Sequence, residues 1–360
     1  MDIKEDKVNY NKDGKFSILS FTKEELEAEL LELGEKKFRA GQVYEWLHQK
    51  NALSFDDMSN ISIDLREKLK DKYFIDNITV LDKLESKMDE TKKFILKLDD
   101  GNIIEAVVMK YKYGNSICIS SEVGCQMGCT FCASTKQGYK RNLRAGEMLK
   151  EIYMIQDIIG ERIGNVVIMG IGEPLMNYDN VVHFLKNIIN PKGLNIGARH
   201  VTLSTCGIVP RIKQLADERM QINLAISLHA SNDEIRKKLM PIANKFSISE
   251  LLDACKYYCE LNNRRMNFEY ALIAGENDKD QNAEELANLL KDFTCFVNLI
   301  PVNEIKENNY KRTSKEATKA FQEKLNERGI DATIRRELGT DIEAACGQLR
   351  NKYMEESENN

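Results

Sequence analysis

The chain has 360 residues, enough for one large domain with a smaller one beside it. Its net charge of −5 gives no support to nucleic-acid binding by bulk electrostatics, so an RNA partner must be held by local basic patches. No run approaches the roughly 20 apolar residues of a membrane span, and the first residues lack the apolar stretch of a signal peptide. We therefore expect a cytoplasmic protein that does not bind a membrane.

Residues 1–75 are expected to form a small N-terminal helical domain. Thr22 and Glu25 have the spacing of a capping box, and apolar residues at helical spacing follow them as far as Gly34. Further helical patterns come next, the last of them over residues 63–70. The charge of this unit is mixed, so any contact that it makes with folded RNA would depend on shape and phosphates.

Residues 76–110 are expected to form a small β hairpin or linker. Alternation at 78–84 and 94–98 predicts two strands, and a turn sequence at 99–101 leads into another apolar run. Glu105 lies in that run, where the residues alone predict an ordinary strand position that faces solvent.

Residues 111–340 alternate strand-like and helical patterns, which predicts a parallel sheet with helices outside it. Six such units, rather than the eight of a closed barrel, predict an α/β fold that forms a partial (β/α)6 TIM-like barrel. Unusual motifs follow five of the strands, and active sites of barrels form at the carboxyl ends of strands. The expected strands are 117–122, 165–171, 200–206, 223–229, 267–274 and 296–302.

Three cysteines, Cys125, Cys129 and Cys132, follow the first of these strands with the spacing CxxxCxxC. Three thiolates can hold a four-iron cluster and leave one iron open, whereas electron-transfer clusters take four cysteines. A structural zinc site is the alternative, but it usually needs four Cys or His ligands, and no histidine lies near this run. The spacing resembles that of the radical S-adenosylmethionine (radical SAM) enzymes. That resemblance implies one [4Fe-4S] cluster per chain, with S-adenosyl-L-methionine (SAM) on the open iron.

From about residue 21 to residue 350 the chain resembles the RlmN family. These radical SAM enzymes are dual-specificity methyltransferases that act on carbon 2 of an adenine in 23S rRNA and in tRNA. Six motifs in order make the resemblance specific: GEKKFRA (34–40), VGCQMGCTFCAST (123–135), MGIGEPLMNYDNV (169–181), RHVTLSTCGIVP (199–210), AISLHA (225–230) and DIEAACGQL (341–349).

The resemblance implies cofactor contacts at the ends of the strands. Gly172 and Glu173 match the pair that binds the amino end of SAM. The other matched positions are Ser204, Ser227, Leu228, His229 and Asn303. Without the resemblance, Ser204 is better explained as a cap of the following helix and His229 as a satisfied core histidine.

The C-terminal segment, residues 341–360, contains Cys346, which resembles the family's methyl-carrying cysteine. Cys118 resembles its partner in a transient disulfide, and Glu105 matches the proton acceptor. In the implied mechanism, Cys346 takes a methyl group from one SAM molecule, and a radical from a second SAM abstracts hydrogen from that methyl group. The carbon radical then adds to carbon 2, Glu105 removes the proton there, and Cys118 attacks the sulfur of Cys346 to release methylated RNA. From the residues alone, Cys118 is a buried small hydrophobic residue.

The implied partners are 23S rRNA before ribosome assembly is complete, tRNA, an electron donor such as flavodoxin or ferredoxin, and a thiol reductant. Four basic residues directly follow the cysteine motif, where phosphate contacts would position RNA near the reaction centre. They are Lys136, Lys140, Arg141 and Arg144.

Two alternatives remain open for the function. A Cfr-like methylase uses the same machinery on carbon 8 of the same adenine, although residues 131–135 and 173–180 look like the carbon-2 family. A non-catalytic iron–sulfur RNA-binding module belongs to a different class, but it has no use for Cys346. The remaining cysteines are expected to be structural: Cys206, Cys255, Cys259 and Cys295.

Overall fold

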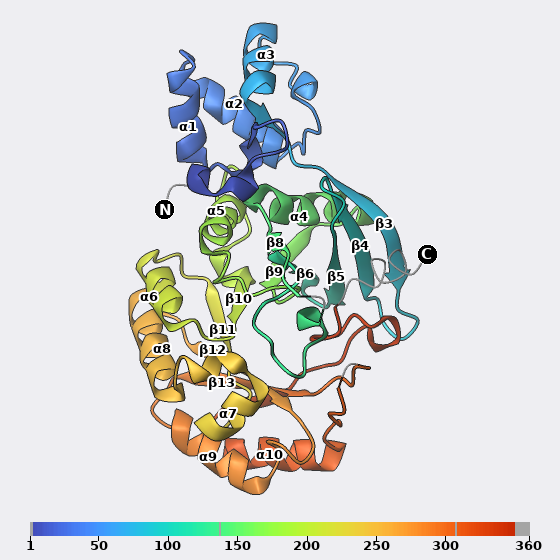
Figure 1. Ribbon diagram of the computed structural model, residues 1–360, viewed down its shortest axis with the longest axis vertical. Helices are drawn as coiled ribbons and strands as arrows, with labels where there is room; N and C mark the ends of the chain where they lie inside the picture. The colour runs from blue at the N-terminus through green and yellow to red at the C-terminus, as the bar shows by residue number, and fades with distance from the viewer. Residues whose placement is uncertain (1–2, 137, 307, 350–360) are drawn as a thin grey trace.

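The computed structural model describes residues 3–136, 138–306 and 308–349. Figure 1 shows a helical unit at the N-terminal end of the molecule, above a larger body built around one sheet. The acidic tail that follows Leu349 lies outside the described residues.

The N-terminal unit contains the expected helices. They are α1 (Lys23–Glu32), α2 (Lys37–His48) and α3 (Ile63–Lys72). The predicted capping box is confirmed, because the Thr22 hydroxyl accepts the Glu25 N–H and the Glu25 carboxylate accepts the Thr22 N–H. Two short strands, β1 (Phe16–Ser17) and β2 (Tyr73–Phe74), pair in parallel and bring the ends of the unit together.

Hydrogen bonds join this helical unit to α4 (Ala145–Ile159) and α5 (Tyr178–Ile189) of the body. The Tyr153 hydroxyl of α4 lies 2.8 Å from Nδ1 of His48, and the Tyr44 hydroxyl donates to Asn187 of α5 over 2.9 Å. Tyr44, His48 and Asn187 are almost completely buried. The helical unit therefore packs directly on the first two helices of the body.

The body is a ten-stranded sheet in the order β14-β13-β12-β11-β10-β9-β6-β5-β4-β3. All six expected parallel strands are present: β6 (Gly114–Ile119), β9 (Ile163–Ile168), β10 (Val201–Thr205), β11 (Asn223–Ser227), β12 (Met266–Leu272) and β13 (Cys295–Pro301). The helices that follow them lie outside the curved sheet (Figure 1): α4, α5, α6 (Val209–Asp217), α7 (Asp233–Leu239), α8 (Ile248–Asn262), α9 (Asp280–Leu290) and α10 (Lys315–Glu327). The predicted partial barrel is confirmed. A seventh parallel strand, β14 (Ala332–Ile334), was not predicted, because its three residues are too few for a pattern.

The antiparallel strands do not form the separate small sheet that was expected for residues 76–110. They are β3 (Ile78–Glu85), β4 (Lys92–Leu98) and β5 (Ile103–Tyr111). The expected hairpin turn is present, but β5 also pairs with β6, so these strands continue the barrel sheet. This pairing satisfies the backbone groups of β6 that would otherwise form an open sheet edge.

The C-terminal segment crosses these antiparallel strands. Asp89, after β3, accepts the Gly339 N–H over 3.0 Å, and Asp341 accepts hydrogen bonds from Ser86 and Lys87 over 2.7 and 2.8 Å. Because this segment covers one face of β4 and β5, the expectation that Glu105 faces solvent is wrong; the residue is 2% exposed. No helix in the described ranges is long and apolar enough to cross a membrane.

Candidate active site

The cysteine motif forms a loop between two short strands, β7 (Glu122–Val123) and β8 (Arg141–Asn142). Gly124 has φ +74°, and a Cβ there would lie 1.7 Å from the Gly138 carbonyl oxygen, so the loop needs glycine at this position. The Thr130 N–H donates to the Leu239 carbonyl over 3.0 Å, which anchors the middle of the loop to α7.

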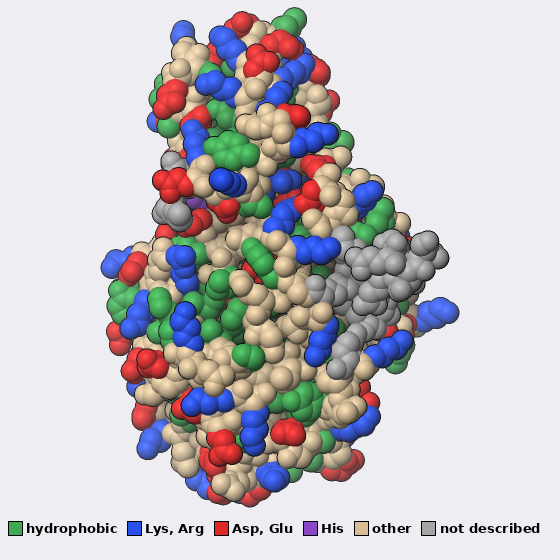
Figure 2. Space-filling model, in the orientation of Figure 1, with side chains coloured by type: hydrophobic (Ala, Val, Ile, Leu, Met, Phe, Trp, Pro, Cys, Tyr) green, Lys and Arg blue, Asp and Glu red, His purple; other side chains and the backbone are tan. Residues whose placement is uncertain are grey.

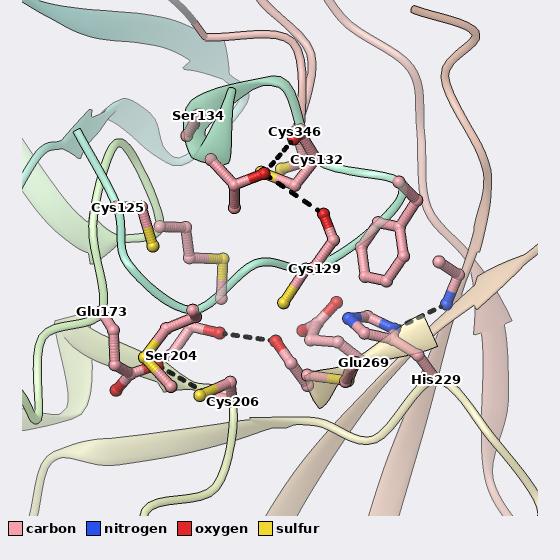
Figure 3. A pocket seen from close by; sticks show the side chains of 18 of the residues that line it. Cys125, Cys129, Cys132, Ser134, Glu173, Ser204, Cys206, His229, Glu269 and Cys346 are labelled. Atoms are coloured by element: carbon pink, nitrogen blue, oxygen red, sulfur yellow. Dashed lines mark hydrogen bonds between the residues drawn. The ribbon is translucent and has the colours of Figure 1, made fainter. Parts of the chain in front are cut away.

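Three thiols of this loop line one cavity, which we call the thiol cavity. Figure 3 shows Cys125, Cys129 and Cys132 around it, with Cys346 near Cys132. Much of the rest of its wall comes from β9, β10, β11, β12 and β13 and from the residues that follow them, where the unusual motifs were expected to meet. Counting its opening to solvent, the cavity encloses about 1010 Å³.

The thiols suit an iron–sulfur cluster better than a single zinc ion. Burial raises the pKa of Cys125 to about 12 and the pKa values of Cys129 and Cys132 above the ordinary range, so a bound cation is needed to make them thiolates. Within the described part of the chain, no three His, Cys, Asp or Glu side chains are placed to hold one metal ion. Three thiols spread around a cavity match a larger, cationic group.

Gly172 and Glu173 lie in the cavity wall, as the sequence predicted for cofactor contacts. Glu173 accepts hydrogen bonds from the Thr205 hydroxyl and the Cys206 N–H, both over 2.7 Å. Glu122, which the sequence did not indicate, accepts the Glu173 N–H over 2.8 Å. A Cβ added at Gly172 would lie 2.6 Å from the Cβ of Glu122. The backbone at Gly172 can therefore pass this close only as glycine.

Charged side chains in the wall suit a cationic ligand such as SAM. Glu173 and Glu269 line the cavity, and burial raises the pKa of each carboxyl group. A sulfonium or ammonium group beside them favours their charged forms. Arg335 is the cation of the wall, and its guanidinium lies 3.9 Å from Glu269. The sequence did not indicate Glu269, and it indicated Arg335 only as part of a basic pair with Arg336 on a candidate RNA-contacting patch.

Ser204, Ser227, His229 and Asn303 also lie in the wall. Ser204 does not cap α6, which begins at Val209 with Ile208 as its N-cap; its hydroxyl instead lies 3.5 Å from that of Ser227.

His229 combines both of the roles considered for it. Its Nδ1 accepts the Ala271 N–H over 2.9 Å, so it is a satisfied buried histidine, yet it also faces the cavity. Burial lowers the pKa of His229 to about 3, which keeps the ring neutral. Leu228 does not line the cavity, because its fully buried side chain packs in the hydrophobic core.

The C-terminal segment docks on the cysteine loop and places Cys346 in the cavity wall. The Ala133 N–H donates to the Gly347 carbonyl over 2.8 Å, and the Ser134 hydroxyl donates to the Leu349 carbonyl over 2.9 Å. The Asn303 side chain donates to the carbonyl of Cys346 over 3.0 Å. Residues far apart in sequence thus hold Cys346 against the motif.

The structure brings Cys118 and Glu105 to the same side of the sheet as Cys346. Cys118 of β6 lies opposite Val107 of β5, and burial, with the nearby Cys346, raises its pKa. Glu105 lies two residues before Val107 on the same face of β5, and its carboxylate is 3.6 Å from the Lys93 ammonium. Neither residue lines the thiol cavity itself.

Two of the four basic residues after the motif form ion pairs within the protein. Arg141 pairs with Asp100 and Glu147, and Arg144 pairs with Asp76 and Glu147. Lys136 and Lys140 are exposed. On the face shown in Figure 2, Lys and Arg side chains are interspersed with Asp and Glu, so basic residues form no dominant patch in that view.

Among the cysteines expected to be structural, Cys206 lies in the wall of the thiol cavity, next to Glu173. Cys255 and Cys259 lie on α8, and Cys295 begins β13. The sequence feature that could have indicated Cys206 as a cavity residue is its position directly after a barrel strand.

Comparison with known proteins matches two family models. Residues 119–290 match the radical SAM superfamily, and residues 16–75 match the ribosomal RNA large subunit methyltransferase N-terminal domain. A probable dual-specificity RNA methyltransferase RlmN of Clostridium novyi is 56% identical over 94% of this chain and 98% of its own length. That of Clostridium perfringens SM101 is 55% identical over 94% and 97%.

A solved structure also matches over most of the chain. The radical SAM methyltransferase from Sphaerobacter thermophilus is 40% identical, with a TM-score of 0.86 over 93% of this chain and 99% of its own. Sequence and structure agree along almost the whole length, including both the helical unit and the barrel. The chain belongs to the RlmN family and is a radical SAM methyltransferase.

Proposed function

We propose that the protein methylates carbon 2 of an adenine in 23S rRNA and in tRNA, through a methylated Cys346 and a covalent protein–RNA adduct. The observation that carries the proposal is the position of Cys346, which lies in the wall of the cavity lined by the three motif thiols. The names of the relatives, dual-specificity RNA methyltransferases, support RNA as the substrate.

Cys125, Cys129 and Cys132 would hold one [4Fe-4S] cluster, and Gly172, Glu173 and the polar wall residues would hold SAM. When bound, these groups would supply one-electron chemistry that the side chains of the protein cannot provide.

Three residues of the protein have separate roles in the proposed reaction. Cys346 accepts a methyl group at sulfur and presents it to the adenine. Glu105 accepts the proton from carbon 2, and Cys118 attacks the Cys346 sulfur, which breaks the carbon–sulfur bond and forms a disulfide. The electrostatic influence of Cys346 on the buried Cys118 thiol supports this last step, because it places the two thiols in one neighbourhood.

The remaining parts of the proposal concern partners. A low-potential donor such as flavodoxin or ferredoxin would reduce the cluster, and a thiol reductant would restore the two cysteines. The rRNA would be modified before ribosome assembly is complete, in the cytoplasm. The helical N-terminal unit supports a role in RNA contact, since it matches an rRNA methyltransferase domain.

The test is anaerobic reconstitution with iron, sulfide, RNA and SAM labelled in its methyl group, followed by nucleoside analysis. Labelled 2-methyladenosine in both RNAs is the expected product. Labelled 8-methyladenosine would identify a Cfr-like methylase instead, and a cluster-loaded protein that forms no 5′-deoxyadenosine would be a non-catalytic RNA-binding module.

A further inference from the structure

A buried lysine faces the proposed proton acceptor. Lys93 of β4 pairs opposite Val107 of β5, so Lys93 and Glu105 are diagonal neighbours on one face of the sheet. Their side chains are 4% and 3% exposed, and Lys93 Nζ lies 3.6 Å from Glu105 Oε1. This buried ion pair is far less accessible than the surface pairs of the helices.

Burial favours the protonated form of a carboxyl group, because an ionised carboxylate loses its hydration there. Glu151 of α4 illustrates the effect within the same molecule, since burial raises its pKa well above the ordinary range. A protonated carboxyl group cannot accept a proton from carbon 2. An ammonium group 3.6 Å away favours the ionised form that a general base requires.

The same lysine also contacts the segment that carries the methyl group. Lys93 Nζ donates to the carbonyl oxygen of Glu343 over 3.3 Å, three residues before Cys346. One buried side chain therefore joins the proposed base on β5 to the C-terminal segment.

We propose that Lys93 is a positioning residue that keeps Glu105 ionised and holds it against the Cys346 segment during release of the RNA. In the step concerned, the C–H bond at carbon 2 breaks, its proton passes to a Glu105 oxygen, and its electron pair stays with the ring. This inference rests on the proposed function, because it assigns Lys93 to one step of that reaction.

The experiment replaces Lys93 by methionine, which has similar volume without charge, and by arginine, which keeps the charge. Lys97→Met is the matched control, because Lys97 lies on the same face of β4 at an exposed position. The reconstituted holoenzymes are tested for Cys346 methylation by mass spectrometry, for 5′-deoxyadenosine, for covalent protein–RNA adduct on denaturing gels, and for released methyladenosine.

In Lys93→Met we expect Cys346 methylation and 5′-deoxyadenosine near wild-type levels, accumulation of the adduct, and release slowed at least ten-fold. Lys93→Arg should recover most of the release, and Lys97→Met should behave as wild type. Release at the wild-type rate in Lys93→Met would overturn the proposal. Equal loss of Cys346 methylation and release in both the methionine and arginine variants would also overturn it, because that result marks a structural role.

A double variant separates action through Glu105 from action elsewhere. The double variant Lys93→Met/Glu105→Gln should release RNA no more slowly than the single variant Glu105→Gln. A further ten-fold decrease in the release rate would contradict the proposal. The proposed function fails in a different way, namely when the wild-type holoenzyme forms no methyladenosine.

Discussion

At the level of single residues, Cys346 and Cys118 lie in different surroundings, which fits their separate parts in the proposed methyl transfer and release. Cys346 lies in the wall of the thiol cavity, where bound SAM would meet it. Cys118 is 7% exposed on β6, and burial raises its pKa, so its reactive thiolate is scarce. In the proposed mechanism, a methyl group delivered in the cavity would therefore go to Cys346, and Cys118 would act only in the release step.

Replacing Cys346 by alanine should abolish RNA methylation and leave the iron–sulfur absorbance intact, because the three motif thiols are unchanged. Anaerobic absorbance spectra and nucleoside analysis of the same sample provide the measurement. Cys259→Ala, a half-buried cysteine on α8 outside the cavity, is the matched control and should keep full activity. Full activity in Cys346→Ala would remove the proposed methyl carrier.

At the scale of elements, the cysteine loop depends on close backbone contact rather than on regular structure. Gly124 packs against Gly138 across the loop, and hydrogen bonds from Ala133 and Ser134 hold the C-terminal segment over it. The loop, the segment and the ends of the parallel strands thus form the cavity together. A substitution in the loop should therefore lower cluster binding more than it lowers the stability of the barrel.

Gly124→Ala should lower the iron content after reconstitution, because a side chain at φ +74° is strained and collides with the Gly138 carbonyl. Left-handed backbone costs a non-glycine residue on the order of 1–3 kcal/mol, and the collision adds to this cost. Iron analysis and thermal unfolding measure the two effects. Gly41→Ala, at an exposed position of α2 where a new Cβ would have no atom within 4 Å, should keep the iron and stabilise the protein slightly. Equal iron content in the Gly124→Ala and Gly41→Ala variants would contradict this prediction.

At the scale of the whole molecule, buried polar contacts join the helical unit to the barrel. His48 is 2% exposed, its Nδ1 bonds to the Tyr153 hydroxyl, and its Nε2 has no hydrogen-bond partner among the described residues. Lys150 of α4 donates to Asn51 across the same boundary over 2.6 Å. Such contacts hold the helical unit in a fixed position relative to the cavity.

Lowering the pH below about 6.5 should weaken this boundary. Burial, with the nearby Lys150, lowers the pKa of His48 from 6.5 to about 3 in the folded protein. The unfolded chain binds a proton that the folded chain does not, so His48 contributes stability above pH 6.5 and that contribution falls as the pH drops toward 3. Relative to His48→Gln, the wild-type free energy of unfolding should fall by up to ~1.4 kcal/mol per pH unit.

Denaturant unfolding between pH 7.5 and 5 measures this difference, with His200→Gln at an exposed position as the control. Parallel pH dependence of the wild type and His48→Gln would show that the buried histidine does not titrate on unfolding.

The sequence allowed the parallel strands to be predicted because each is a separate apolar run with a helical pattern after it. Strand alternation shows which residues share a face, but it does not show which edge a strand pairs with, so the continuation of the sheet into β5, β4 and β3 was missed. The burial of Glu105 was also missed, because its cover comes from residues around Glu343, far along the chain. Motif spacing indicated the thiols, whereas Lys93 and Glu122 could be recognised as neighbours of the site only in the folded chain.

The central claim is that the methyl group passes through Cys346 and loses one hydrogen to a radical before it reaches the RNA. The most direct measurement is mass spectrometry of the product nucleoside after reaction with SAM that carries a trideuterated methyl group. We expect a methyl group with two deuterium atoms and one hydrogen, because one deuterium is abstracted and solvent supplies the last proton. A product that retains all three deuterium atoms would mean direct polar transfer and would contradict the account.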